Sequence, residues 1–303
     1  MKKILLAAVS LSALTGVAFA ADLPSRKEAV VPPPPPPMWQ GFYAGLNAGY
    51  SWGVNQNTYS QNWGINSATN SVYVDPISMD GVIPMTQSGF MGGAQFGYNY
   101  QYGSNIVLGV ETDIQGSNVR GSGRSFGATT ASQAVSASTS NYQNAFGSTT
   151  VQGGLDYLGT VRGRIGYLWS PALLIYGTGG FAYGGAWANV VQTATASEGT
   201  AIGATRNPPT GTYVWNGAGQ QSQLLTGWTA GAGAEWMFMP NWSVKAEALY
   251  WDLGRMNINT ASYDSDGDGI GWGRTNVNYA GVTARAGINY HFNFGNMPVV
   301  AKF

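Results

Sequence analysis

Apolar residues alternate with small or polar residues in eight separate runs of this sequence. In the first run, Phe42, Leu46 and Trp52 alternate with Asn47 and Ser51. A period of two places successive side chains on opposite faces of a β-strand, whereas a helix has a period of about 3.6. The pattern therefore predicts eight strands, each with one apolar face, over residues 42–52, 90–102, 106–114, 155–169, 173–187, 224–238, 242–250 and 280–292.

The charged residues of these runs are predicted to share the polar faces of their strands. Charged residues make up only 9% of the chain, compared with about 25% in a typical soluble domain. The apolar faces are rich in aromatic residues, which favours contact with lipid rather than a dry core. We therefore predict an all-β fold, an eight-stranded antiparallel up-and-down transmembrane β-barrel whose polar faces line the interior. The charged residues assigned to that interior are Glu111, Asp113, Asp156, Arg162, Arg164, Glu235, Lys245, Glu247 and Arg285.

Short and long connections alternate between the predicted strands. Tight turns are predicted at 103–105, 170–172 and 240–241, and long loops at 54–88, 116–153, 188–222 and 254–275. This alternation is typical of periplasmic turns and long extracellular loops. Aromatic residues gather beside the short turns, where they are expected to lie at the membrane interface: Tyr100, Trp169, Trp236, Trp242 and Phe292.

The N-terminal residues carry the signals of an exported protein. Lys2 and Lys3 precede an apolar segment that ends in Ala18-Phe19-Ala20, so residues 1–20 are predicted to be a signal peptide cleaved between Ala20 and Ala21. Residues 21–38 contain six consecutive prolines and form a predicted periplasmic linker. The barrel is expected to span 39–294, followed by a C-terminal tail at 295–303. These features together predict a location in the bacterial outer membrane.

The inward charges are predicted to neutralise one another, because an unpaired buried charge is costly. Side chains just fill the interior of a barrel with about eight strands. The charge network, which we assign to Glu111, Asp113, Arg162, Arg164, Glu235, Lys245, Glu247 and Arg285, is therefore interpreted as a structural plug. A narrow aqueous path through it is the alternative. No catalytic pairing is implied, and we predict that the protein is not an enzyme.

Three other sequence features could in principle form a binding or catalytic site. Asp264, Asp266 and Asp268 match the first half of a Ca²⁺ loop, although Thr275 stands where a bidentate Glu is needed; a solvated turn without a cofactor is the default expectation. The run 177–182 imitates a dinucleotide fingerprint but no helix pattern follows it. The single His291 offers little basis for a metal site, and no Ser–His–Asp set is predicted around it.

Several segments resemble the OmpA-like outer-membrane immunogenic proteins of alphaproteobacteria, which are small β-barrels of the porin family. These segments are ADLPSRK at 21–27, WQGFYAGLNAGY at 39–50, LGTVRGRIGY at 158–167 and KAEALYWDLG at 245–254. The resemblance covers nearly all of the predicted strands and implies an eight-stranded barrel, surface exposure, and roles in envelope integrity or host contact. Some members are linked to haem, but no residue here carries that over. Phe303 is expected to be the assembly signal; whether Phe292 or Phe303 closes the last strand stays open.

The sequence thus predicts a structural and surface-interaction protein, with a role in adhesion or as an antigen. The alternative is a narrow porin, or a receptor or uptake protein for a small ligand such as haem. Expected partners are the lipid bilayer and lipopolysaccharide, the outer-membrane assembly machinery, and a host surface or small molecule. Nucleic acid is not expected, because the formal net charge is +0 and binding to phosphates needs a basic excess.

Overall fold

The computed structural model describes residues 38–54, 57–66, 81–134, 139–202, 205–209, 211–265 and 269–292. They all belong to one unit, Pro37–Phe303. They form β1 (Gly41–Gly53), β2 (Thr58–Asn66), β3 (Gly81–Ile83), β4 (Thr86–Tyr102), β5 (Ile106–Ala134), β6 (Thr139–Ser170), β7 (Leu173–Ile202), β8 (Thr205–Arg206), β9 (Gly211–Met239), β10 (Trp242–Asp264) and β11 (Gly269–Phe292).

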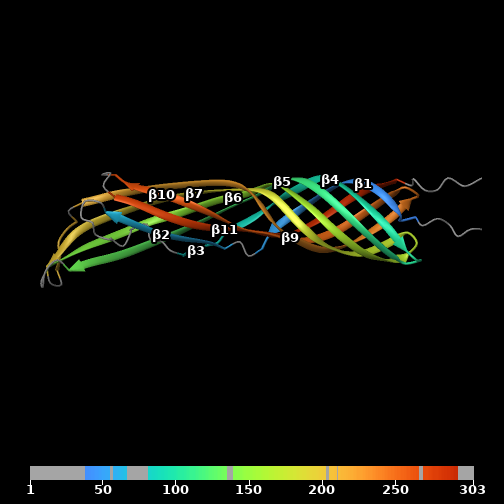
Figure 1. Cartoon of the computed structure of the whole chain (residues 1–303). Helices are drawn as coiled ribbons and strands as arrows, with labels where there is room; N and C mark the ends of the chain where they lie inside the picture. Colours follow the sequence, from blue (N-terminus) through green and yellow to red (C-terminus); the bar gives the residue numbers. More distant parts are fainter. Residues whose placement is uncertain are drawn as a thin grey trace, which may run out of the picture. The chain divides into compact units, whose positions relative to one another are not determined.

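Strands β1 and β11 pair with each other, and this pairing closes the sheet into a barrel (Figure 1). The order around the ring is β1, β4, β5, β6, β7, β9, β10 and β11, and all neighbours are antiparallel. The closing pair runs in register from Phe42 opposite Phe292 to Gly53 opposite Gly281. The predicted eight-stranded antiparallel barrel is confirmed. Closure leaves no exposed ladder edge along β1, which matters wherever water cannot satisfy backbone groups.

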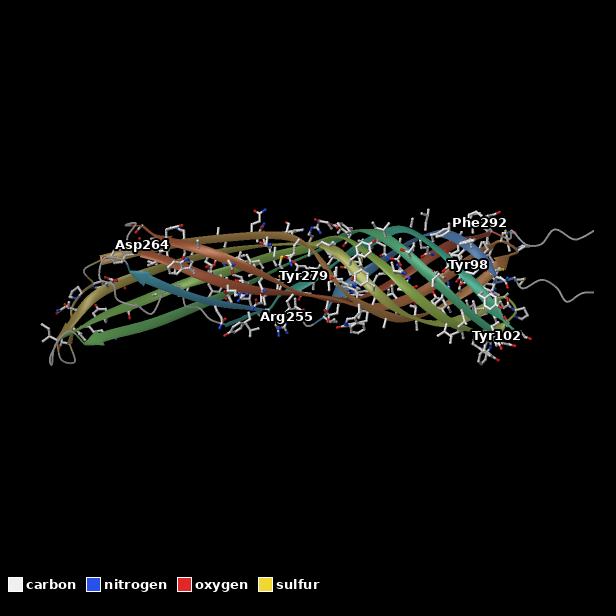
Figure 2. All side chains as sticks on the ribbon, in the orientation of Figure 1. Tyr98, Tyr102, Arg255, Asp264, Tyr279 and Phe292 are labelled. Atoms are coloured by element: carbon white, nitrogen blue, oxygen red, sulfur yellow. The ribbon has the colours of Figure 1, made fainter. Side chains whose placement is uncertain are left out.

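The barrel has two different ends. At the turn end, tight turns join β4 to β5, β6 to β7 and β9 to β10, and Gly41 and Phe292 lie beside them. Gly103 has a φ of 63°, a left-handed conformation that glycine adopts easily in such a turn. At the extended end, β2 takes over from β1 as the neighbour of β11, pairing from Tyr59 opposite Asn276 to Asn66 opposite Gly269. Tyr102 and Asp264 mark the two ends in Figure 2.

The strands continue far beyond the predicted runs, so the prediction of long loops was largely wrong. β5, β6, β7 and β9 contain 29, 32, 30 and 29 residues, whereas about 9–11 residues cross a bilayer. Most of the described residues in 116–153 and 188–222 belong to these four strands, and most of those in 254–275 belong to β10 and β11. The physical reason is that a hydrogen-bonded ladder needs no apolar outer face once its outer face contacts water.

A bulge in β6 corrects the assignment of Asp156. The register with β7 shifts between Leu155 and Tyr157, so that Asp156 and Tyr157 both point outward. A bulge inserts one residue into a strand and reverses the alternation beyond it. Asp156 therefore lies on the outer surface, where its carboxylate accepts a hydrogen bond from Arg120 at 2.8 Å.

Candidate functional site

The outer surface next to the turn end is a continuous band of exposed apolar side chains, here called the apolar band. On β1 it extends from Phe42 to Trp52. The interface aromatics Tyr100, Trp169, Trp236 and Trp242 are exposed on its turn-end side, and Phe292 is half-buried there. Further members on other strands are Phe90, Phe96, Val110, Ile114, Val161, Ile165, Ile175, Phe181, Trp228, Val244 and Ile288. No helix in the described ranges is long and apolar enough to cross a membrane.

Inside the band, the structure brings eight charged side chains into one buried network of four cations and four carboxylates. Arg162 lies at its centre. Its guanidinium donates hydrogen bonds to Glu111, to Asp113 at 2.9 Å and to Glu247 at 2.5 Å. Arg285 reaches the same Asp113 at 2.9 Å and Glu247 at 3.0 Å. Two cations thus share two carboxylates, which neutralises charge that water cannot reach.

The other half of the network lies around Glu111 and Glu235. Lys245 Nζ donates to both oxygens of Glu111, at 2.9 and 3.0 Å. Arg164 donates to Glu235 at 2.7 Å. The side chains of all eight residues are at most 3% exposed, so these ion pairs are fully enclosed.

The register of the sheet places partners opposite one another. Glu111 lies across from Arg162, Lys245 from Glu235, and Glu247 from Arg285. Directly opposed residues on one face of an antiparallel pair are close enough for their side chains to interact. The charges come from β5, β6, β9, β10 and β11, so the network ties together strands on different sides of the ring.

Two tyrosines complete the network and were not singled out from the sequence. The hydroxyl of Tyr43 donates to Glu111 at 2.7 Å and accepts from Arg164 at 3.0 Å. The guanidinium of Arg164 also lies 4.0 Å from the ring centre of Tyr176. A side chain at Gly97 would overlap the ring of Tyr43. A large aromatic on the polar face, with glycine on the neighbouring strand, is the sequence signal that could have found Tyr43.

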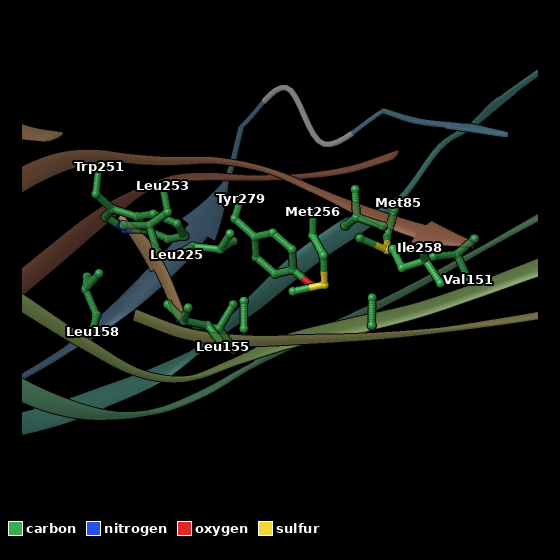
Figure 3. Close-up of a cluster of buried hydrophobic side chains, with 14 of the residues drawn as sticks. Met85, Val151, Leu155, Leu158, Leu225, Trp251, Leu253, Met256, Ile258 and Tyr279 are labelled. Carbon is green, nitrogen blue, oxygen red and sulfur yellow. The ribbon is translucent and has the colours of Figure 1, made fainter. Parts of the chain in front are cut away.

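Apolar side chains fill the interior on both sides of the network. Toward the turn end, Trp39, Val107, Leu168, Leu174 and Met237 are buried beside Tyr176. Toward the extended end lies a larger cluster, here called the apolar plug, which Figure 3 shows lying within the barrel. Its labelled members are Met85, Val151, Leu155, Leu158, Leu225, Trp251, Leu253, Met256, Ile258 and Tyr279. The hydroxyl of Tyr279 crosses the interior to donate to the carbonyl of Trp187 at 2.6 Å.

A serine and a glutamate lie next to His291. Ser243 Oγ lies 2.9 Å from His291 Nε2 and donates to Glu235 at 2.6 Å. Glu235 is 3.4 Å from the same ring nitrogen. A catalytic triad needs the carboxylate on the other nitrogen, where it orients the imidazole toward the serine. All three side chains are also buried, so this cluster extends the charge network.

The remaining predicted features find no further support. Residues 177–182 lie within β7, with no helix after them. Asp264 ends β10 and is half-buried, whereas Asp266 and Asp268 lie outside the described residues, and the Ca²⁺ loop stays a prediction. Among the described residues no group of three His, Cys, Asp or Glu could hold a metal ion. Ala20, Ala21, Phe294 and Phe303 also lie outside the described residues.

The outer face of the extended end combines polar side chains with exposed aromatics. Phe126 on β5 and Phe146 on β6 stack with their ring centres 6.4 Å apart and are 63% and 59% exposed. The guanidinium of Arg124 lies 4.9 Å from the ring centre of Phe126. Exposed aromatics of this kind are enriched at protein interfaces. This pair, the aromatic pair, is the second candidate site.

Comparison with known proteins gives the decisive match. The chain is 33% identical over 298 residues to the 31 kDa outer-membrane immunogenic protein of Brucella melitensis biotype 1, covering 96% of this chain and 100% of the relative. The chain belongs to this family. The same protein of Brucella suis biovar 1 matches equally well. This member of the 31 kDa outer-membrane immunogenic proteins is an outer-membrane β-barrel, so its apolar band contacts lipid.

Solved structures share the barrel architecture at much lower similarity. The attachment invasion locus protein Ail of Yersinia pestis is 12% identical, with a TM-score of 0.25 over 81% of this chain and 99% of that chain. The outer membrane protein OprG of Pseudomonas aeruginosa is 11% identical, with a TM-score of 0.37 over 84% and 97%. No family model matches the chain, and the OmpA-like and porin-family labels stay predictions.

Proposed function

We propose that this immunogenic-protein family member is a non-enzymatic barrel that is anchored by its apolar band and presents its extended end outside the cell. Its role is then structural and surface-interacting, in adhesion or as an antigen. The observation that carries the proposal is the division of the barrel into two parts. The lipid-facing part has an interior filled by the charge network. The apolar plug fills the interior next to it and continues beyond the end of the apolar band, and the extended part has exposed aromatics on its outer face.

The filled interior favours a structural role over the alternative of a narrow porin. An ion would have to pass both a neutralised network and a plug of buried apolar side chains. Apolar constrictions stop conduction because water leaves them. We therefore expect the purified protein to show no steady single-channel conductance in a planar lipid bilayer. Steady, reproducible conductance steps that vanish with unfolded protein would instead support the pore or small-ligand uptake.

The surface-interaction role predicts that the aromatic pair contributes to contact with other cells. Bacteria producing the wild-type protein should adhere to a host-cell monolayer more than bacteria without it. Phe126→Ser combined with Phe146→Ser should remove most of that gain, because buried aromatic anchors dominate interface energies. A Val191→Ser variant, which changes an exposed apolar residue on β7, should keep it.

Display at the cell surface is checked separately in the same cells. The chain has no cysteine, so single introduced cysteines can be labelled cleanly. A membrane-impermeant maleimide should label Gln221→Cys at the extended end on intact cells, and Ser104→Cys at the turn end only after lysis. Equal adhesion of the aromatic-pair variant and the wild type, at equal display, would count against the adhesion role.

The partners follow from this placement and belong to the proposal. Lipid and lipopolysaccharide surround the apolar band, and the outer-membrane assembly machinery inserts the barrel. The proposed host partner is a surface that accepts exposed aromatic rings.

A further inference from the structure

A hollow of about 630 Å³ opens on the outer wall of the barrel, at the place where β2 takes over from β1. Its size falls within the range of about 300–1,000 Å³ that is typical of small-ligand pockets. Side chains from β2, β10 and β11 and from the residue before β2 line it: Asn57, Tyr59, Asp252, Arg255, Asn276 and Asn278.

The backbone builds this hollow into the fold. The pairing of β10 with β11 shifts register between Asp252 and Arg255. Between them, Gly254 has a φ of 81°, a conformation that favours glycine. The Asp252 carboxylate accepts a hydrogen bond from the Gly254 amide at 2.8 Å. The irregularity is thus fixed by a local hydrogen bond. It inserts one extra residue into β10 opposite β11, so that Arg255 as well as Asp252 lies on the outer face beside the hollow.

The hollow lies directly beyond the apolar band. Along β10 the outward residues are apolar from Trp242 to Tyr250 and become polar at Asp252. On β1 the band ends at Trp52, which is 48% exposed. Figure 2 labels Arg255 between the two ends of the barrel. Tyr and Trp mark the level where hydrocarbon meets the polar part of a membrane, so the hollow faces the sugar layer just above it.

The chemistry of the lining suits a sugar that carries negative charge. The amides of Asn57 and Asn276 can bind hydroxyl groups as donors and acceptors, and the ring of Tyr59 is 41% exposed. Arg255 is exposed and has no ion-pair or hydrogen-bond partner among the residues that the structure describes. A guanidinium binds carboxylate or phosphate through two parallel hydrogen bonds. Asp252 is the one acidic group of the lining, and its carboxylate accepts a hydrogen bond from the Gly254 amide.

We propose that this hollow binds the acidic saccharide of lipopolysaccharide, with Arg255 holding a carboxylate or phosphate group and the asparagines holding hydroxyls. The hollow opens on the side wall of the barrel at the level of the sugar layer. Lipopolysaccharide in the same leaflet can therefore reach it by lateral diffusion. The inference rests on the proposed orientation, in which the extended end lies outside the cell.

The test is a titration of the folded protein in detergent with lipopolysaccharide purified from the producing strain, and separately with the delipidated core oligosaccharide. Arg255→Gln should raise Kd by about tenfold or more for both ligands, because it removes a charge-assisted contact. Asn276→Asp, which adds a carboxylate to the lining, should weaken binding at least as much. Arg120→Gln, a matched control on β5 whose partner is Asp156, should change Kd by less than about twofold.

Each result decides the proposal. Unchanged lipopolysaccharide affinity in Arg255→Gln and Asn276→Asp overturns it. Binding of the oligosaccharide without binding of lipopolysaccharide also overturns it, because the source is then a free glycan. Each variant is also run on a gel without boiling and after boiling. A difference in migration between the two samples shows that the variant is folded. The titration uses neither cells nor the aromatic pair, so it can fail while adhesion and surface labelling succeed, and the reverse.

Discussion

Arg162→Ala is expected to lower the free energy of unfolding by about 3–5 kcal/mol, the cost of breaking a buried ion pair by removing one partner. Arg162 contacts three carboxylates, Glu111, Asp113 and Glu247, and all of these side chains are buried. Without it, Lys245 and Arg285 must neutralise the three, helped only by Arg164 at 3.6 Å from Glu111. The change is measured by urea unfolding of the protein in lipid vesicles, followed by tryptophan fluorescence.

The control for Arg162 is Arg120, an arginine whose ion pair lies on the outer surface and whose guanidinium also donates to the carbonyl of Leu155 at 2.7 Å. Arg120 pairs with Asp156 on the outer surface, where the two side chains are 40% and 55% exposed. Such surface pairs contribute about 0–1 kcal/mol and a typical hydrogen bond about 0.5–1.5 kcal/mol, so Arg120→Ala should lower the free energy of unfolding clearly less than Arg162→Ala. If Arg162→Ala were as stable as Arg120→Ala, the network would not hold the barrel together.

Trp251→Ala is expected to cost about 3–5 kcal/mol, the usual loss for removing a large buried aromatic. Trp251 is 1% exposed and belongs to the apolar plug, and its indole donates to Thr283 at 3.0 Å. Its ring also packs against Gly281, where an added Cβ would lie 2.5 Å from it. The variant leaves a cavity that the surrounding strands cannot close, and the same unfolding assay measures it.

Trp272 provides the comparison for Trp251. It lies on β11, points outward and is 41% exposed, so Trp272→Ala should change the free energy of unfolding by less than about 0.5 kcal/mol. If Trp251→Ala lowered the free energy of unfolding by less than about 1 kcal/mol, the surrounding side chains would have to repack into the space that the indole leaves.

The lipid-facing half of the barrel could be predicted because lipid and the interior make opposite demands on neighbouring residues. Val161 faces lipid while Arg162 lies in the network. Because this contrast in polarity between neighbouring residues recurs along eight runs, only a barrel with its polar faces inside fits all of them. The same contrast separated inward charges from outward aromatics. It did not reveal Asp156, because a one-residue bulge leaves no mark in residue type.

The strands of the extended half could not be predicted, because inward and outward residues there differ much less in polarity. On β7, Ala194 and Ala196 face inward while Thr193 and Thr195 face outward, and these residues differ little in hydropathy. The contact of Ser243 with His291 was missed for another reason. These residues are 48 positions apart in the chain, and only the pairing of β10 with β11 brings them together.

Because the outer face of the extended end is built from strands, the residues on it alternate with residues that hold the interior together. A substitution at Thr193 or Thr195 changes the outer surface without disturbing the packing at Ala194 or Ala196. Such surface changes usually cost little stability. The exterior can therefore diverge between related bacteria at every second position, while the hydrogen-bonded frame stays the same.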